Sequence, residues 1–186
     1  MDNKKFLNEY FDIYRKLAFN ESCYEQIEAF AKLAENVRDN GKKLLFAGNG
    51  ASAAISAHGA VDFTKQGGVR AVTFNEADHI TCFANDYGYD RWIEKSVEFY
   101  GDEGDVLVLI SVSGTSPSVV EAAKYAKKIG MKVVTFTGKD SDNALKALGD
   151  INFWVDSAAY NIVECIHMMW LTTAIDLVIG EAEYSV

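Results

Sequence analysis

The chain has 186 residues, of which 49% are hydrophobic and 24% are charged, a composition typical of one globular domain. The formal net charge of −9 and the scattered basic residues exclude the positive surface expected of a protein that binds nucleic acid or an anionic membrane. Cys23, Cys82 and Cys165 have no paired spacing, and we expect no signal peptide, so the sequence predicts a cytoplasmic protein with reduced thiols.

Two amphipathic helices are predicted within residues 2–40, where apolar side chains recur at spacings of three and four. The apolar positions are Phe6, Tyr10, Ile13 and Leu17 in the first helix, and Ile27, Phe30, Leu33, Ala34 and Val37 in the second. Asn20 and Ser22 lie between them and favour a break with a new cap. Because the first helix carries several large aromatic side chains, we expect it to pack on another subunit.

A strand, a glycine turn and a helix follow within Lys43–His58. The short apolar run Leu44–Ala47 is typical of a strand buried on both faces. Gly48-Asn49-Gly50 has minimal side-chain bulk and tolerates positive φ, and the alanine-rich segment 51–60 predicts a helix. Such a turn directs free backbone N–H groups and the positive end of a helix dipole at one point, so we expect an anion, and first of all a phosphate, to bind there.

The same arrangement recurs about sixty residues later. Val106–Ser111 is a second apolar strand, and it is followed by a turn that contains Ser113, Thr115 and Ser116. Ser116 is a good N-cap and Pro117 a good first helical residue. Two strand ends with small polar turns can converge on one ligand at a switch point of a parallel sheet.

The remaining elements alternate between strands and helices. The predicted strands are 70–74, 131–136 and 151–155, and the predicted helices are 76–87, 91–100, 118–129 and 160–180. This alternation predicts a three-layer α/β/α sandwich around a five-stranded parallel sheet, in a single domain that spans residues 1–186.

The last predicted helix is apolar on nearly all sides, so we expect it to be buried in the core or between subunits. Within it, the most apolar stretch, Cys165–Ile179, is interrupted by His167 and Asp176. We therefore expect this stretch to be too short for a membrane span.

Two pairs of ionisable residues are candidates for chemistry. His58 and Asp62 are four positions apart on one helix face, where they could act as acid, base or metal ligands or simply pair on the helix surface. Glu164 and His167 are three apart in an apolar helix, where a buried carboxylate needs a partner. The two may pair with each other, or they may face His58 and Asp62 and form a proton-transfer or divalent-metal site.

Two further pairs of residues and one histidine are less informative. Asn85 and Asp86 suggest contacts with ligand hydroxyls, but Asn-Asp also forms turns. Lys139 and Asp140 follow a strand and are better explained as solvent-facing residues. His79 has no partner at motif spacing.

Several segments together resemble the SIS (sugar isomerase) domain family, and among its members most closely the phosphoheptose isomerases. The segments are GNGAS at 48–52, His58, ANDYG at 84–88, the run 103–140 that includes SVSGTS, and the late helix. The resemblance covers nearly the whole chain and implies a SIS-type, flavodoxin-like fold. It also implies a cytoplasmic homotetramer, with sites at the subunit interfaces, that acts on a phosphorylated sugar.

Carried over by position, the resemblance implies a role for individual residues. Ser111, Ser113 and Ser116, with Thr115 nearby, would hold the phosphate. Asn49, Gly50 and Ser52 would bind the sugar, and Asp86 would contact a sugar hydroxyl. Some members bind zinc through the histidine that His58 resembles, which makes His58, Asp62 and Glu164 the candidate ligands of zinc or another divalent metal.

The chain departs from those isomerases at three positions. Asp62 stands where they have a catalytic glutamate, and Glu164 stands where they have a glutamine. Thr172 falls on their second catalytic histidine, and a threonine cannot shuttle protons at neutral pH as imidazole can. Either His167 or another subunit supplies that function, or the protein does not isomerise the heptose.

The sequence therefore supports three hypotheses. The first is an aldose/ketose isomerase that converts sedoheptulose 7-phosphate to a heptose 7-phosphate, with Asp62 as the base and His167 or Glu164 returning the proton. The second is a non-catalytic module that binds a phosphosugar or a protein partner and regulates another process. The third is an isomerase for a different phosphosugar.

Overall fold

The structure, a computed structural model, describes residues 2–184. Five parallel strands form its sheet in the order β2-β1-β3-β4-β5. They are β1 (Leu44–Gly48), β2 (Ala71–Thr73), β3 (Val106–Ser111), β4 (Lys132–Thr137) and β5 (Ile151–Trp154). The predicted parallel sheet is confirmed, and β1 and β3, which carry the two polar turns, are neighbours at its centre.

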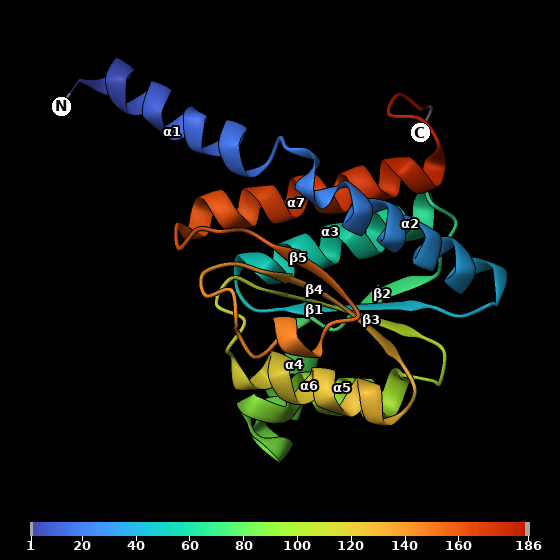
Figure 1. Cartoon of the computed structure of the whole chain (residues 1–186). Coiled ribbons are helices and arrows are strands. Elements are labelled where there is room, and N and C mark those ends of the chain that lie inside the picture. The colour runs from blue at the N-terminus through green and yellow to red at the C-terminus, as the bar shows by residue number, and fades with distance from the viewer. Residues whose placement is uncertain (1, 185–186) are drawn as a thin grey trace.

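Helices cover both faces of the sheet, as the strand and helix alternation predicts (Figure 1). One face is covered by α2 (Tyr24–Asp39), α3 (Ala51–Lys65) and α7 (Tyr160–Ile179). The other is covered by α4 (Ala77–Tyr87), α5 (Trp92–Tyr100) and α6 (Pro117–Lys128). Side chains that alternate along each strand build a core on each side, because successive residues of a strand point to opposite faces.

The structure adds three short 3-10 turns to the predicted helices and strands. Single 3-10 turns connect helices or precede a strand at η1 (Glu21–Cys23), η2 (Tyr89–Arg91) and η3 (Lys146–Leu148). Asp86, which also favours a turn, lies in the last turn of α4, and that helix ends at Tyr87 before Gly88, where φ is +87°. Pro117 begins α6 as predicted, and Ser116 takes the N-cap position without making a side-chain capping bond.

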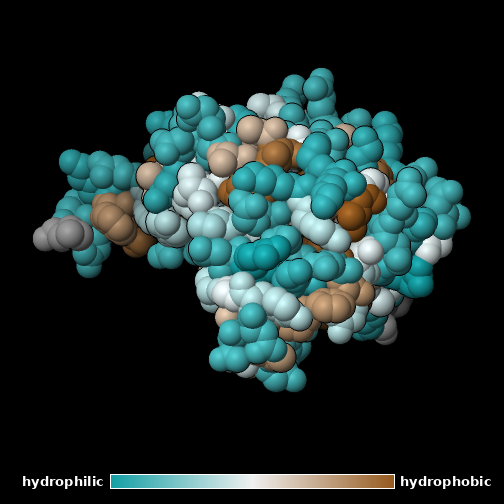
Figure 2. Space-filling view, turned by 90° about the horizontal axis from the view of Figure 1, so that it is seen from below, coloured by the Kyte–Doolittle hydropathy of each residue, from teal (hydrophilic) through white to brown (hydrophobic). Residues whose placement is uncertain are grey.

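Helix α1 (Asn3–Leu17) stands apart from the sandwich (Figure 1). The side chain of Asp2 caps it by accepting hydrogen bonds from the amides of Lys4 and Lys5. None of its residues is buried, and Phe6 and Phe11 are 49% and 53% exposed. Figure 2 shows this helix projecting from the body with hydrophobic side chains on it. Several apolar side chains of this amphipathic helix are thus left uncovered in the single chain. The expectation that α1 packs on another subunit stays a prediction.

Helix α7 is buried along one face only, whereas its sequence predicts burial on nearly all sides. The buried face holds Ile162, Val163, Ile166, His167, Trp170, Leu171, Ala174 and Ile175. By length and composition alone the whole of α7 could cross a membrane, with a mean hydropathy of 1.6 over an 18-residue window. The expectation that its Cys165–Ile179 stretch is too short for a span stays a prediction. It packs against α2, α3 and the sheet, as a core helix of a soluble protein does.

Candidate functional site

A pocket of about 120 Å³ lies where β1 and β3 end and the two polar turns begin. Its lining comprises Asn49, Ser52, Ile110, Ser111, Val112, Ser113, Ser116, Tyr160 and Glu164. The adjacent parallel strands place the two turns side by side, because their carboxyl ends lie at the same edge of the sheet. Helices α3 and α6 both begin here, so two helix N-termini meet at one pocket.

The first turn depends on Gly50 and Asn49. Gly50 has φ +61° and ψ −128°, a conformation that side-chain-bearing residues rarely adopt, and it forms the N-cap of α3. The Nδ2 of Asn49 donates a hydrogen bond to Ser118 Oγ at 3.1 Å, and Tyr89 Oη donates one to Asn49 Oδ1 at 2.9 Å. Asn49 therefore connects the first turn to α6, the helix that follows the second turn in the chain.

The second turn is held partly by its own hydroxyl groups. Ser111 Oγ accepts a hydrogen bond from the Gly114 amide, and Ser113 Oγ accepts one from the Thr115 amide, both at 3.3 Å. Within residues 2–184, the amides of Ser113 and Ser116 donate to no other protein group. These two amides and the uncapped Ser116 hydroxyl are thus available to an anion.

Helix α7 contributes Tyr160 and Glu164 to the same pocket. Glu164 was predicted as a site residue, and its position one helical turn after Tyr160 brings both to the pocket edge. Sequence reasoning missed Tyr160, Ser118 and Tyr89. A signal for Tyr160 was present, because the first residue of a helix that follows β5 must lie at the carboxyl edge of the sheet.

His58 and Asp62 form a pair on α3 but do not line this pocket. His58 Nε2 lies 3.1 Å from Asp62 Oδ2, and the two side chains are 50% and 24% exposed. Burial and then the charge of Asp62 raise the pKa of Asp176, which places Asp62 beside the last turns of α7. Glu164 is twelve residues before Asp176, or about 18 Å along the axis, so one chain does not bring Glu164 to the His58–Asp62 pair.

His167 faces the core and not the pocket. It is fully buried, and its Nε2 donates a hydrogen bond to the backbone carbonyl of Thr137 at 3.0 Å. Burial lowers its pKa from 6.5 to about 4, so the ring is neutral at physiological pH. It forms no hydrogen bond with Glu164. This position favours a structural role and removes His167 from the acid and base residues that we propose below.

The three predicted metal ligands do not lie together in one chain. His58 and Asp62 supply two donors, whereas a catalytic zinc site usually has three protein ligands. Within the part of the chain that the structure describes, no group of three or more His, Cys, Asp or Glu side chains could hold a metal ion. The residues of a single chain therefore do not fit zinc, and no step below depends on a metal.

Three other predicted ligand residues lie outside the pocket lining: Gly50, Thr115 and Asp86. Gly50 contributes only backbone, as the N-cap of α3. Thr115 is exposed at the tip of the second turn. Asp86 is exposed on α4, where it accepts a hydrogen bond from Asn85 and lines a separate pocket with aromatic residues of α4 and α5. Neither side chain reaches the phosphate turns within this chain, so their predicted contacts would need a different subunit or a bound sugar that extends toward them.

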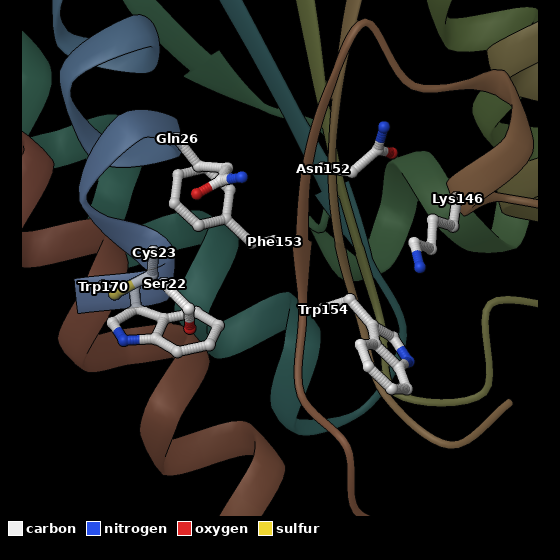
Figure 3. Close-up of a pocket in the computed structure, with 8 residues that line it drawn as sticks. All are labelled: Ser22, Cys23, Gln26, Lys146, Asn152, Phe153, Trp154 and Trp170. Carbon is white, nitrogen blue, oxygen red and sulfur yellow. The ribbon is translucent and has the colours of Figure 1, made fainter. Parts of the chain in front are cut away.

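A second pocket, of about 330 Å³, lies beside the edge strand β5 and contains none of the predicted site residues (Figure 3). Gln26 of α2 lies over the ring of Phe153, while Trp154 and Lys146 lie on the other side of the strand. Lys146 Nζ already donates to the Ser141 carbonyl at 2.9 Å, and Asn152 is bonded to Thr135 and Gly149. Because its polar groups are largely occupied, this pocket is a poorer candidate for a site.

Comparison with known proteins agrees with this geometry. A family model described as SIS domain matches residues 6–138. A phosphoheptose isomerase of Fusobacterium nucleatum is 36% identical over 171 residues, which are 89% of this chain and 88% of the relative. A phosphoheptose isomerase of Vibrio cholerae is 32% identical over 178 residues, which are 92% of this chain and 93% of the relative.

Solved structures give the same result. A phosphoheptose isomerase from Neisseria gonorrhoeae matches with a TM-score of 0.85 and 30% identity, over 96% of this chain and 99% of that one. A phosphoheptose isomerase from Francisella tularensis matches with a TM-score of 0.86 and 27% identity, over 97% of this chain and 100% of that one. The chain therefore belongs to the SIS domain family. Its similar curated relatives within that family are phosphoheptose isomerases.

Proposed function

We propose that this protein is a phosphosugar isomerase that converts sedoheptulose 7-phosphate to a heptose 7-phosphate. The observation that carries the proposal is the pocket at the ends of β1 and β3, in which free amides and serine hydroxyls lie beside the carboxylate of Glu164. The free amides and serine hydroxyls can donate hydrogen bonds to a phosphate, and the carboxylate can transfer a proton. The identity of the relatives supports the choice of sugar.

The reaction moves one proton between adjacent carbons. A base removes a proton from C1 of the open-chain ketose, and the released electron pair forms the C1–C2 double bond of a cis-enediol as the C2 oxygen takes up a proton. Return of a proton to C2 and loss of the O1 proton then give the aldose. Asp62 is our candidate for the base, with His58 at 3.1 Å to orient it, and Glu164 is our candidate for returning the proton.

We propose that a complete site needs two subunits. The phosphate pocket and Glu164 belong to one chain, and the His58–Asp62 pair of a neighbouring chain would face them. The exposure of this pair and the uncovered apolar face of α1 support an assembly, which we propose is a homotetramer. In it, a divalent metal could take donors from more than one chain. Three free cysteines support a cytoplasmic location.

The alternative function is a non-catalytic module that binds a phosphosugar. Thr172 favours it, because the hydroxyl of Thr172 donates to the backbone of its own helix and cannot replace an imidazole in proton transfer. An isomerase for another phosphosugar is compatible with the same observation. The pairing of His58 with Asp62 and the presence of Glu164 in the pocket favour catalysis over both simple binding and regulation.

Replacement of Asp62 by Asn tests the proposed function. We expect exchange of the C1 proton of sedoheptulose 7-phosphate with deuterated solvent to fall by roughly 10²- to 10⁴-fold, because a positioned base contributes about that much. The affinity for inorganic phosphate should not fall, because Asp62 supplies none of the amides and hydroxyls that line the phosphate pocket. Proton exchange is measured by NMR and affinity by calorimetry, with and without added divalent metal.

The outcomes distinguish the hypotheses. Undiminished exchange in the Asp62→Asn protein would remove Asp62 from the mechanism. Measurable binding of several ketose phosphates without exchange of any C1 or C2 proton by the wild-type protein would support the binding module. Exchange with a shorter ketose phosphate but not with the heptulose would support an isomerase for a different sugar.

A further inference from the structure

Lys139 has an unusual backbone conformation. With φ +52°, it is the single non-glycine residue with positive φ among residues 2–184. A long side chain in this region costs on the order of 1 kcal/mol or more, so the surrounding structure must hold it there. Such strain often accompanies a functional site, and Lys139 follows β4, whose carboxyl end adjoins that of β3.

The backbone of Lys139 is fixed by two hydrogen bonds. Its amide donates to the Ser157 carbonyl at 2.9 Å, and its carbonyl accepts from Trp154 Nε1 at 3.3 Å. The preceding residue, Gly138, donates its amide to the carbonyl of Val112, which lines the phosphate pocket. Lys139 is therefore attached to the second polar turn and held in one orientation.

That orientation brings the ammonium group to the rim of the pocket. Lys139 Nζ lies 4.7 Å from the centre of the Tyr160 ring, and Tyr160 lines the pocket together with Glu164. Within the described residues, no carboxylate lies within 4.0 Å of Lys139 Nζ. A cation–π contact keeps an ammonium in place without neutralising its charge.

The pocket itself lacks a positive side chain. Its lining contains serine hydroxyls and one carboxylate, Glu164, in a protein with a formal net charge of −9. A phosphate dianion there would be repelled by Glu164 and by the acidic exterior. We propose that Lys139 is the phosphate-binding cation of this site, with its ε-ammonium moving from the ring of Tyr160 to the phosphate oxygens. This inference rests on the proposed function, because it assigns a residue to the same phosphate pocket.

Substitution of Lys139 by Asn tests the inference. Asparagine removes the charge but tolerates positive φ better than most residues, so the turn should keep its conformation. We expect the dissociation constant for inorganic phosphate and the KM for the ketose phosphate to rise roughly ten- to a hundredfold, as for the loss of a charged hydrogen bond. The kcat should change much less, and binding should depend less on salt than in the wild-type protein.

Two further variants serve as controls. Lys139→Arg keeps the positive charge and should retain most of the affinity for inorganic phosphate. Lys146→Gln removes a lysine that also rests on an aromatic ring, 4.6 Å from the centre of Trp154, but lies outside the phosphate pocket. This second change should leave phosphate affinity within about twofold of the wild type, because Lys146 contributes no group to the phosphate pocket.

Three results would overturn the inference. The first is wild-type affinity for inorganic phosphate in the Lys139→Asn protein. The second is an equal loss of that affinity in the Lys139→Asn and Lys146→Gln proteins. The third is an equal loss of that affinity in the Lys139→Asn and Lys139→Arg proteins when circular dichroism shows that both are folded. Failure of the wild-type protein itself to bind inorganic phosphate or any phosphorylated ketose would instead overturn the proposed function, and with it this assignment.

Discussion

His167 illustrates how burial can set the protonation state of one residue. Because its folded-state pKa is about 4 and the ordinary value is 6.5, the unfolded chain binds a proton between these pH values and the folded chain does not. The stability of the folded state should therefore fall as the pH is lowered from 6.5 toward 4.

Replacement of His167 by Gln should flatten this dependence. Glutamine can still donate to the Thr137 carbonyl but does not titrate. The free energy of unfolding of the wild-type protein should decrease by on the order of 3 kcal/mol more than that of the variant over this pH range, at about 1.4 kcal/mol per pH unit. Urea unfolding at several pH values measures both slopes, and parallel slopes would contradict the assignment of the low pKa.

At this scale the sequence predicts residue types better than side-chain directions. Asn49, Ser113 and Ser116 were placed correctly, because short polar side chains in a tight turn have few directions available. Glu164 and His167 are three residues apart, and their spacing predicts proximity but not which of them faces the sheet. That choice depends on the rotation of α7 against β4, which is set by packing of residues far away in the sequence.

The turn between β3 and α6 has no room for a larger side chain at Gly114. Gly114 has φ +62°, and a Cβ atom added there would lie 2.0 Å from Asn143 Oδ1. Asn143 is buried and accepts a hydrogen bond from the Lys146 amide, so it has little room to move. The Leu145 amide also donates to the Gly114 carbonyl at 2.9 Å. The segment after β4 thus supports the phosphate turn from behind.

Substitution of Gly114 by Ala should destabilise the protein by about 2 to 4 kcal/mol, the sum of a backbone cost and a steric cost. Gly41→Ala is the matched control, because Gly41 has φ +66° but nothing within 4 Å of an added Cβ, so only a backbone cost of about 1 kcal/mol applies. Urea midpoints measure both changes. Equal losses of stability in the two variants would show that Asn143 can move away from the added Cβ without an energetic cost.

The strands and helices were easier to predict from the sequence than the directions of single side chains. The runs at Leu44 and Val106 are nearly continuous in apolar residues, and buried parallel strands require that pattern. Pro117 fixed the start of α6 through its missing N–H. The end of α4 at Tyr87 also agrees with the predicted helix 76–87, although Asn85 and Asp86 favour turns in isolation, because Gly88 ends the helix.

For the whole molecule, the exposed face of α1 predicts that assembly and activity are linked. Changing Phe6 and Phe11 together to Ser should reduce the size of the assembly, because two side chains about half exposed in the single chain would lose their contacts with a neighbour. Analytical ultracentrifugation measures the size. Isomerase activity should fall with it, whereas phosphate affinity should persist, because the phosphate pocket lies within one chain.

The control for this experiment changes Lys5 and Glu9 to Ser, which breaks a fully exposed ion pair on the polar side of the same helix. That variant should keep the size and activity of the wild type, since exposed pairs contribute little. An unchanged assembly in the Phe6 and Phe11 variant would contradict a role for α1 in subunit contacts. The sequence predicted such contacts from aromatic content alone, but it could not predict that the N-terminal part of α1 projects from the sandwich while Tyr14 and Leu17 still pack against the core.

The position of α7 in the chain has a consequence for biosynthesis. A helix that contains an 18-residue window with a mean hydropathy of 1.6 would be a hazard if it left the ribosome ahead of its partners, since it could aggregate or be taken for a membrane anchor. Here the strands and the helices α2 and α3 are all translated earlier, so a docking surface can already exist when α7 emerges. Because its packing partners are translated first, this apolar helix can be covered as soon as it is synthesised.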